Sequence, residues 1–169
     1  MIVRICKAID HICDASGALT AFYIAALATL AMVEIICRNI LSYSIPFATE
    51  YAGYLVILSM LTGLGWAMKE GAHIQVLLLH SRIPQRFRPH TDMATSILGF
   101  IVSGFFAAAL WRFGLTTWTQ GTVSYFPSQT PLAYPQLLMA IGPTTLCLAC
   151  LARILRLHSG GRAQEEQAL

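Results

Sequence analysis

Two cysteines near the end of the chain, Cys147 and Cys150, have the spacing of a redox-active thiol pair. Such a pair exchanges disulfides when one of its thiols is accessible and easily ionised. These two fall inside an apolar stretch, where lipid disfavours the thiolate, and the lone Cys37 has no second cysteine nearby with which to relay electrons. Packing within a helix is therefore the favoured interpretation, and a membrane thiol–disulfide oxidoreductase is the enzymatic alternative.

Glu34, Arg38 and Glu50 are the charged residues that could couple transport to an ion or bind a partner. Glu34 and Arg38 stand four apart with the acid first, which favours an ion pair on a helix surface. Glu50 lies near the start of the next apolar stretch, where a carboxylate interacts favourably with the helix dipole. We predict that the three residues contact another helix or a partner protein. A small autonomous oligomeric exporter, with Glu34 as its coupling carboxylate, is the alternative.

Histidines could ligate haem, as they do deep in the facing helices of electron-transfer bundles. All the histidines lie outside the centres of the apolar stretches: His11, His73, His80, His90 and His158. Those centres contain no Asp, Glu, Lys or Arg either, although an ion path through a membrane needs such groups. The sequence predicts no catalytic residue, metal ligand or cofactor in this chain, and it favours a structural membrane module over an enzyme.

Four apolar stretches carry these residues, at 15–37, 48–68, 93–113 and 134–155. Each is about 20 residues long, which as a helix matches the roughly 30 Å hydrocarbon thickness of a bilayer. Charged residues make up only 11% of the chain, well below a soluble domain. We predict an all-α integral membrane protein with four transmembrane helices in one domain, residues 1–158, followed by a flexible polar tail, 159–169.

The positions of the basic residues predict the orientation in the membrane. Of the 11 Lys and Arg residues, all but Arg38 and Arg112 lie before the first stretch, between the second and third, or after the fourth. The positive-inside rule then places both termini and the middle joint in the cytoplasm, with Arg112 at the outer exit of the third span. We interpret the basic residues as topology signals and lipid-headgroup contacts, not as a nucleic-acid surface.

The first residues are predicted to stay on the mature protein. The apolar run is too long for a signal peptide, and Asp10 and Asp14 interrupt the charged segment before it. Within 2–13 the Ile and Cys residues recur at helical spacing. This pattern predicts an amphipathic helix at the cytoplasmic interface that leads into the first span.

The joint between the second and third spans contains a short apolar run, 74–79. It is too short to cross a membrane, so we predict an amphipathic helix lying in the interface. Lys69 and His73 stand where the second span leaves the membrane. We predict that they fix this turn by binding freed carbonyls or lipid phosphate, and a solvated His with a snorkelling Lys is the alternative.

The joint 116–135 is rich in Thr, Ser, Gly, Pro and aromatic residues. Such a loop can present ring and backbone surfaces to another protein, or it can be a solvated connector. Tyr125 and Phe126 are its candidate contacts for a partner. Small residues four apart in the second and third spans, such as Gly99 and Ser103, predict close helix packing.

Several motifs, taken in order, resemble the small membrane subunit (DctQ type) of tripartite ATP-independent periplasmic (TRAP) transporters. They are EIICRN at 34–39, ATEY at 48–51, GLGWAMKEGAHIQV at 63–76 followed by Ile83-Pro84, and 128–143 from SQTP to IGP. The resemblance covers most of the chain. It departs at Leu77, where the family often has an acid.

The resemblance implies a role in the bacterial inner membrane. In such systems a periplasmic binding protein captures an organic acid or related solute, and a large permease subunit moves it with an ion gradient, usually of sodium. The small subunit packs against the large one as a scaffold and contributes to docking of the binding protein. Sodium is then expected in the large subunit, and this chain is expected to contact the large subunit, the binding protein and lipids.

Overall fold

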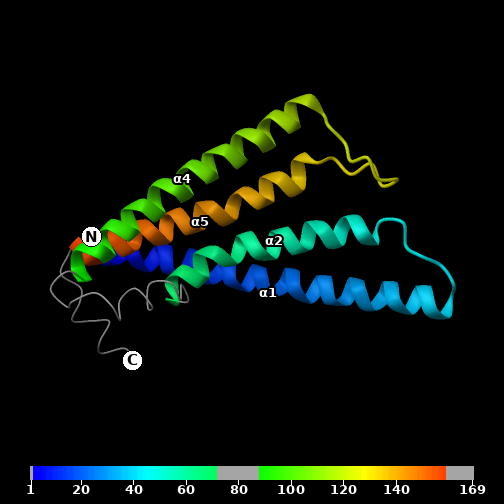
Figure 1. The fold of residues 1–169 in the computed structure, drawn as a ribbon, viewed down its shortest axis with the longest axis horizontal. Coiled ribbons are helices and arrows are strands. Elements are labelled where there is room, and N and C mark those ends of the chain that lie inside the picture. Colours follow the sequence, from blue (N-terminus) through cyan, green and yellow to red (C-terminus); the bar gives the residue numbers. More distant parts are fainter. Residues whose placement is uncertain (1, 72–87, 159–169) are drawn as a thin grey trace.

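Four long helices make up most of the residues that the computed structural model describes, 2–71 and 88–158. They are α1 (Ile2–Ile40), α2 (Ala48–Lys69), α4 (Arg88–Gln120) and α5 (Ala133–His158), as Figure 1 shows. Each contains a window long and apolar enough to cross a membrane. The prediction of an all-helical protein with four membrane-spanning helices is therefore confirmed. The predicted interfacial helix, His73 and the tail 159–169 lie outside the described residues.

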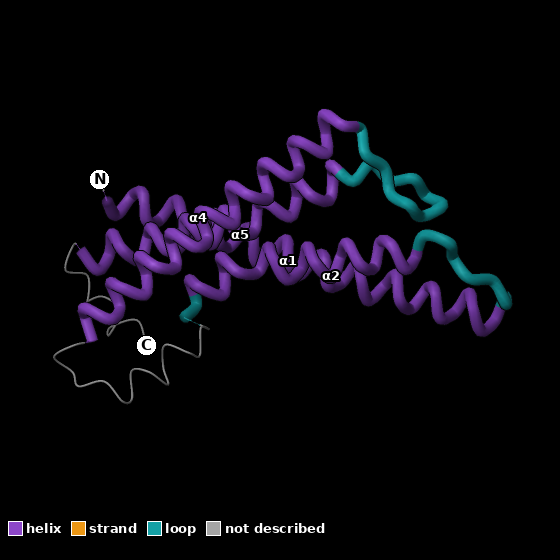
Figure 2. The backbone as a smooth tube through the Cα atoms, turned by 45° about the horizontal axis from the view of Figure 1, so that its top comes forward, coloured by secondary structure: helices purple, strands orange, loops and turns teal. Residues whose placement is uncertain are grey.

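The helices form two antiparallel pairs, α1 with α2 and α4 with α5, joined where α2 packs on α5 (Figure 1). The pairs meet at the end where α1 begins and α5 finishes, which we call the terminal end. They diverge toward the other end, which carries the connections 41–47 and 121–132 and which we call the loop end (Figure 2). α4 packs chiefly on α5, so most of its surface is open to the surroundings.

The contact between α2 and α5 depends on two glycines. A Cβ atom on Gly142 would collide with the backbone carbonyl of Leu61, and one on Gly65 would lie 2.6 Å from Thr145 Oγ1. In lipid there is no hydrophobic drive between helices, so close backbone approach supplies the van der Waals contact that holds them. Both glycines are therefore needed at this crossing.

Hydroxyl groups join α1 to α2 at the same level. The Ser16 hydroxyl donates to the backbone carbonyl of Thr62, and Thr20 Oγ1 and Thr62 Oγ1 lie 2.9 Å apart. The side chain of Thr62 is 0% exposed. Next to these contacts, Gly17 lies against the ring of Trp66. Interhelical hydrogen bonds of this kind add to packing where water does not compete.

The segment at the start of the chain is helical and leads into the first span, as predicted. The two form a single continuous helix, α1. Its buried side chains, Cys6, Ile9 and Cys13, pack against Ala149 and Ala152 of α5. The apolar face of this segment therefore covers another helix of the same protein.

Candidate functional site

Glu50 is the most enclosed carboxylate at the loop end. It lies in the first turn of α2 and is 4% exposed. Its Oε1 accepts a hydrogen bond from the Tyr54 hydroxyl (2.7 Å), and its Oε2 accepts one from the Ser128 hydroxyl. Ser128 belongs to the connection between α4 and α5, so this hydrogen bond joins two residues that are 78 positions apart.

The connection 121–132 forms a small hairpin, which we call the outer hairpin. The Ser124 amide donates to the Thr130 carbonyl (2.9 Å), and the Leu132 amide donates to the Thr122 carbonyl (3.1 Å). Gly121 ends α4 with a φ of +62°, a conformation that glycine adopts without strain. The outer hairpin is therefore held by its own backbone.

Several polar contacts tie the outer hairpin to α2. Ser128, Ser124 and Thr130 hydrogen-bond to Glu50, and the hydroxyls of Tyr51 and Thr130 lie 3.3 Å apart. At this end the two helix pairs have diverged, and the outer hairpin reaches across from α4 and α5 toward α2 (Figure 1). The outer hairpin thus connects the pairs where the helices themselves do not.

The predicted aromatic contacts lie on this hairpin. Tyr125 is fully exposed and Phe126 is partly exposed. The Phe126 amide donates to Ser124 Oγ (3.2 Å), which fixes the backbone between the two rings. A rigid loop that presents an exposed ring can contact another protein without ordering a flexible segment first.

Glu34 and Arg38 form the predicted ion pair, with 2.8 Å between Arg38 Nη2 and Glu34 Oε1. The Ser44 hydroxyl (2.8 Å) and the Ile45 amide (2.9 Å) also donate to this carboxylate. Glu34 therefore fixes the connection between α1 and α2, whereas Glu50 fixes the outer hairpin. The three predicted residues fall into two separate groups.

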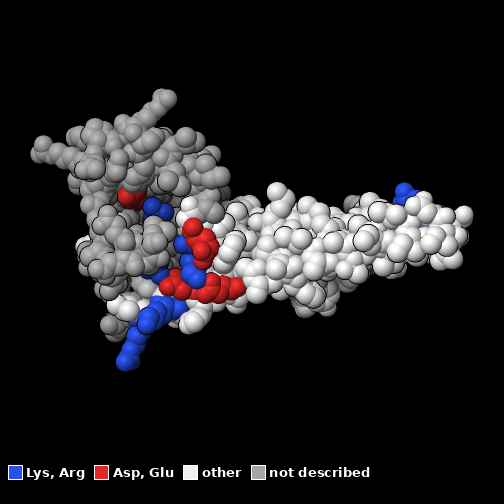
Figure 3. All heavy atoms as spheres, turned by 90° about the horizontal axis from the view of Figure 1, so that it is seen from below, with Lys and Arg blue, Asp and Glu red and all other residues white. Residues whose placement is uncertain are grey.

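The terminal end carries a set of ion pairs between helices, and charged atoms gather there on the face shown in Figure 3. Arg156 Nη2 of α5 lies 2.5 Å from Asp10 Oδ2 of α1, and Lys69 of α2 pairs with Asp14 of α1. Lys69 was predicted to bind carbonyls or lipid phosphate, and its partner Asp14, 55 positions away in the sequence, was not predicted.

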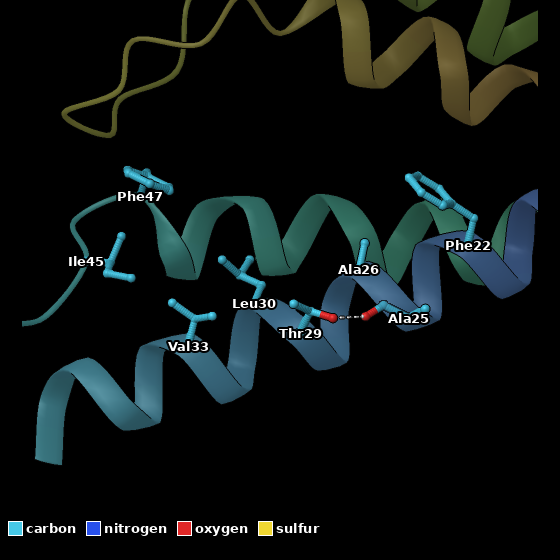
Figure 4. Close-up of a pocket in the computed structure, with 8 residues that line it drawn as sticks. All are labelled: Phe22, Ala25, Ala26, Thr29, Leu30, Val33, Ile45 and Phe47. Atoms are coloured by element: carbon cyan, nitrogen blue, oxygen red, sulfur yellow. Dashed lines mark hydrogen bonds between the residues drawn. The ribbon is translucent and has the colours of Figure 1, made fainter. Parts of the chain in front are cut away.

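A shallow groove of about 530 Å³ runs along the loop-end half of α1 (Figure 4). Its lining is apolar apart from one hydroxyl: Phe22, Ala25, Ala26, Thr29, Leu30, Val33, Ile45 and Phe47. That hydroxyl, of Thr29, donates within its own helix to the Ala25 carbonyl (2.8 Å). The groove offers apolar surface and no free polar group, so it provides no means of catalysis.

The cysteine pair lies between helices. Cys147 and Cys150 are free thiols, and they face Gly104 and Gly99 of α4. Cys147 Sγ is 3.9 Å from the Phe100 carbonyl oxygen. This arrangement is that of packed side chains, and it gives no support to a thiol–disulfide enzyme. Within the described parts of the chain, no group of His, Cys, Asp and Glu side chains could hold a metal ion.

The fold and these contacts define a four-helix integral membrane protein. A family model described as the DctQ component of tripartite ATP-independent periplasmic transporters matches residues 15–160. No curated protein and no solved structure matches the chain. The family match covers most of the sequence, and the chain belongs to the DctQ family, the small membrane subunits of bacterial TRAP transporters.

Proposed function

We propose that this small subunit is the membrane-fixed scaffold of its transporter. In this proposal it packs against the large permease subunit, which moves an organic acid or related solute with a sodium gradient. The proposal depends on one observation: the acidic groups of the loop end are hydrogen-bonded within this chain. Glu34 and Glu50 both accept hydrogen bonds from the chain's own side chains or backbone. Both carboxylates thus hold connections of this chain's own fold.

The outer hairpin is the proposed contact for the periplasmic binding protein. The positive-inside rule puts the terminal end in the cytoplasm and the loop end in the periplasm, because the Lys and Arg residues are concentrated near the terminal end. Tyr125 then faces the compartment of the binding protein on a hairpin fixed by backbone hydrogen bonds.

Uptake in proteoliposomes tests the scaffold role. The large subunit, the binding protein and this chain are reconstituted together, and solute uptake is measured with a sodium gradient. Leaving out this chain should abolish uptake, and Glu34→Gln should leave the number of sodium ions per solute unchanged. A changed sodium stoichiometry in a fully assembled Glu34→Gln complex would contradict the scaffold role, and uptake by this chain alone would favour the exporter.

A further inference from the structure

Arg112 lies deeper along its helix than the sequence indicates. The apolar pattern places it at the outer exit of the third span, but α4 continues past it to Gln120. That is about two further turns, or roughly 12 Å. Beyond Arg112, α4 still packs on α5, because Gly114 lies against Leu137 and the rings of Trp118 and Tyr134 meet at 5.6 Å between centroids. Arg112 is therefore level with the membrane-spanning part of α5.

The guanidinium of Arg112 is exposed, and it has no hydrogen bond or ion pair with any residue in the described ranges 2–71 and 88–158. Four other basic residues of the helices are paired within the chain: Arg38 with Glu34, Lys69 with Asp14, Arg153 with Asp92 and Arg156 with Asp10. Arg4 and Lys7 are exposed near the terminal end, away from membrane depth. An arginine stays charged in a protein, and a charge at membrane depth is costly unless it is paired. Arg112 thus needs an anionic group from outside this chain.

The direction of the helix decides between a lipid phosphate and a protein carboxylate. Side chains on a helix lean toward its N-terminus, and α4 begins at the terminal end. Arg112 is close to the other end of α4, so its side chain leans away from the nearer headgroup layer and toward the middle of the membrane. A carboxylate on a neighbouring transmembrane helix suits this direction better than a lipid phosphate.

The surface around Arg112 fits a helix. One or two turns away on the same side of α4 lie Phe105, Ala108 and Leu115, and all three are exposed. Phe105 is 79% exposed, the highest value among the large apolar side chains of α4. Ala108 lies next to the charge and allows a close backbone approach. We call these four residues the Arg112 face.

We propose that the Arg112 face binds a transmembrane helix of the large permease subunit, and that Arg112 pairs there with a carboxylate of that subunit. The proposal rests on the proposed packing of this chain against the large subunit. It adds the face that makes the contact and the chemistry of the partner residue.

Co-purification of the two subunits tests the pairing. Tagged chain and large subunit are co-expressed and isolated in a mild detergent, and the large subunit is quantified by mass spectrometry. Arg112→Leu should lower its recovery on the order of tenfold, because it leaves the partner carboxylate unpaired in the membrane. Arg112→Lys keeps the charge and should retain most of the recovery. Arg4→Leu is the control, because Arg4 is exposed at the terminal end of α1.

A photoreactive amino acid at position 108 identifies what covers the face. A covalent adduct with the large subunit, mapped to a peptide that contains Asp or Glu, is expected. Adducts with lipid alone, or full recovery of the large subunit with Arg112→Leu, would overturn the proposed Arg112 contact. Neither result would contradict the proposed packing of the two subunits. If the wild-type chain recovers no large subunit, the proposed packing itself is wrong.

Discussion

The two ends of this bundle are held together in different ways. At the terminal end, ion pairs link one helix directly to the next: Asp10 with Arg156, Asp14 with Lys69 and Asp92 with Arg153. At the loop end, the helix pairs have diverged, and the carboxylate of Glu50 joins them through the outer hairpin. The difference indicates that helix–helix contact fixes the terminal end, whereas a few hydrogen bonds fix the loop end. The loop end should therefore open at a lower free-energy cost.

The largest effect should come from the crossing of α2 and α5, on which both ends depend. Gly142→Ala places a Cβ against the Leu61 carbonyl, and it should lower the free energy of unfolding by about 1–3 kcal/mol. Gly53→Ala is the matched control, because a Cβ there meets nothing within 4 Å. It should leave the stability unchanged or raise it by up to about 1 kcal/mol. Unfolding in mixed detergent micelles, followed by circular dichroism, measures both. Equal losses of unfolding free energy in the Gly142→Ala and Gly53→Ala variants would show that the α2–α5 crossing is not close-packed.

A smaller loss should follow from breaking an ion pair at the terminal end. Asp10→Asn removes the carboxylate that Arg156 binds through one nitrogen at 2.5 and 2.6 Å. The expected loss is about 1–2 kcal/mol in the same unfolding experiment, since hydrogen bonds between charged groups are stronger than neutral ones. His11→Ala, an exposed neighbour, should change the stability by less than about 0.5 kcal/mol. If the two variants behave alike, the ion pairs do not fix this end.

The smallest effect on global stability should come from the loop end. Glu50→Gln weakens the contact with Ser128, and the expected loss is about 0.5–1 kcal/mol. Opening of the outer hairpin is the more sensitive measurement. The Ser124 amide, which donates to the Thr130 carbonyl within the outer hairpin, should take up deuterium roughly two to five times faster in the Glu50→Gln variant.

Glu34→Gln is the control for that measurement. Glu34 binds Arg38 and the connection between α1 and α2, and not the outer hairpin. It should therefore leave the deuterium uptake of the Ser124 amide unchanged. Faster uptake in both variants would mean that the loop end opens as a single unit, and the distinction between its two carboxylates would be wrong.

The four spans could be predicted because each depends on local composition and length alone. The Glu34–Arg38 pair could also be predicted, since residues four apart in a helix are neighbours. Glu50 stood out in the sequence as a carboxylate at the start of an apolar stretch, but its partner Ser128 did not. No rule of spacing relates residues so far apart in the chain, and a Ser in a polar loop has many other partners available.

The helix α4 extends beyond the predicted apolar stretch for a physical reason. Hydropathy reports where the apolar surface stops, and a helix can continue beyond that point with polar side chains. α4 does so through Thr116, Thr117 and Thr119, whose hydroxyls donate to carbonyls of their own helix. The apolar stretch of α4 ends at 113, which predicts Arg112 at the exit of the span. The nearest signal of the true end was Gly121, a residue suited to the position after a helix C-terminus.

The order of the helix pairs along the chain bears on how the protein enters the membrane. α1 and α2 are consecutive, as are α4 and α5, and the members of each pair pack on each other. Each pair can therefore form as a helical hairpin while the ribosome is still synthesising the rest of the chain. The two hairpins join last, because Leu61 and Gly65 of α2 contact Gly142 and Thr145 of α5, which are synthesised later. A pulse-labelled chain should thus acquire protease resistance in two stages, and Gly142→Ala should delay only the second.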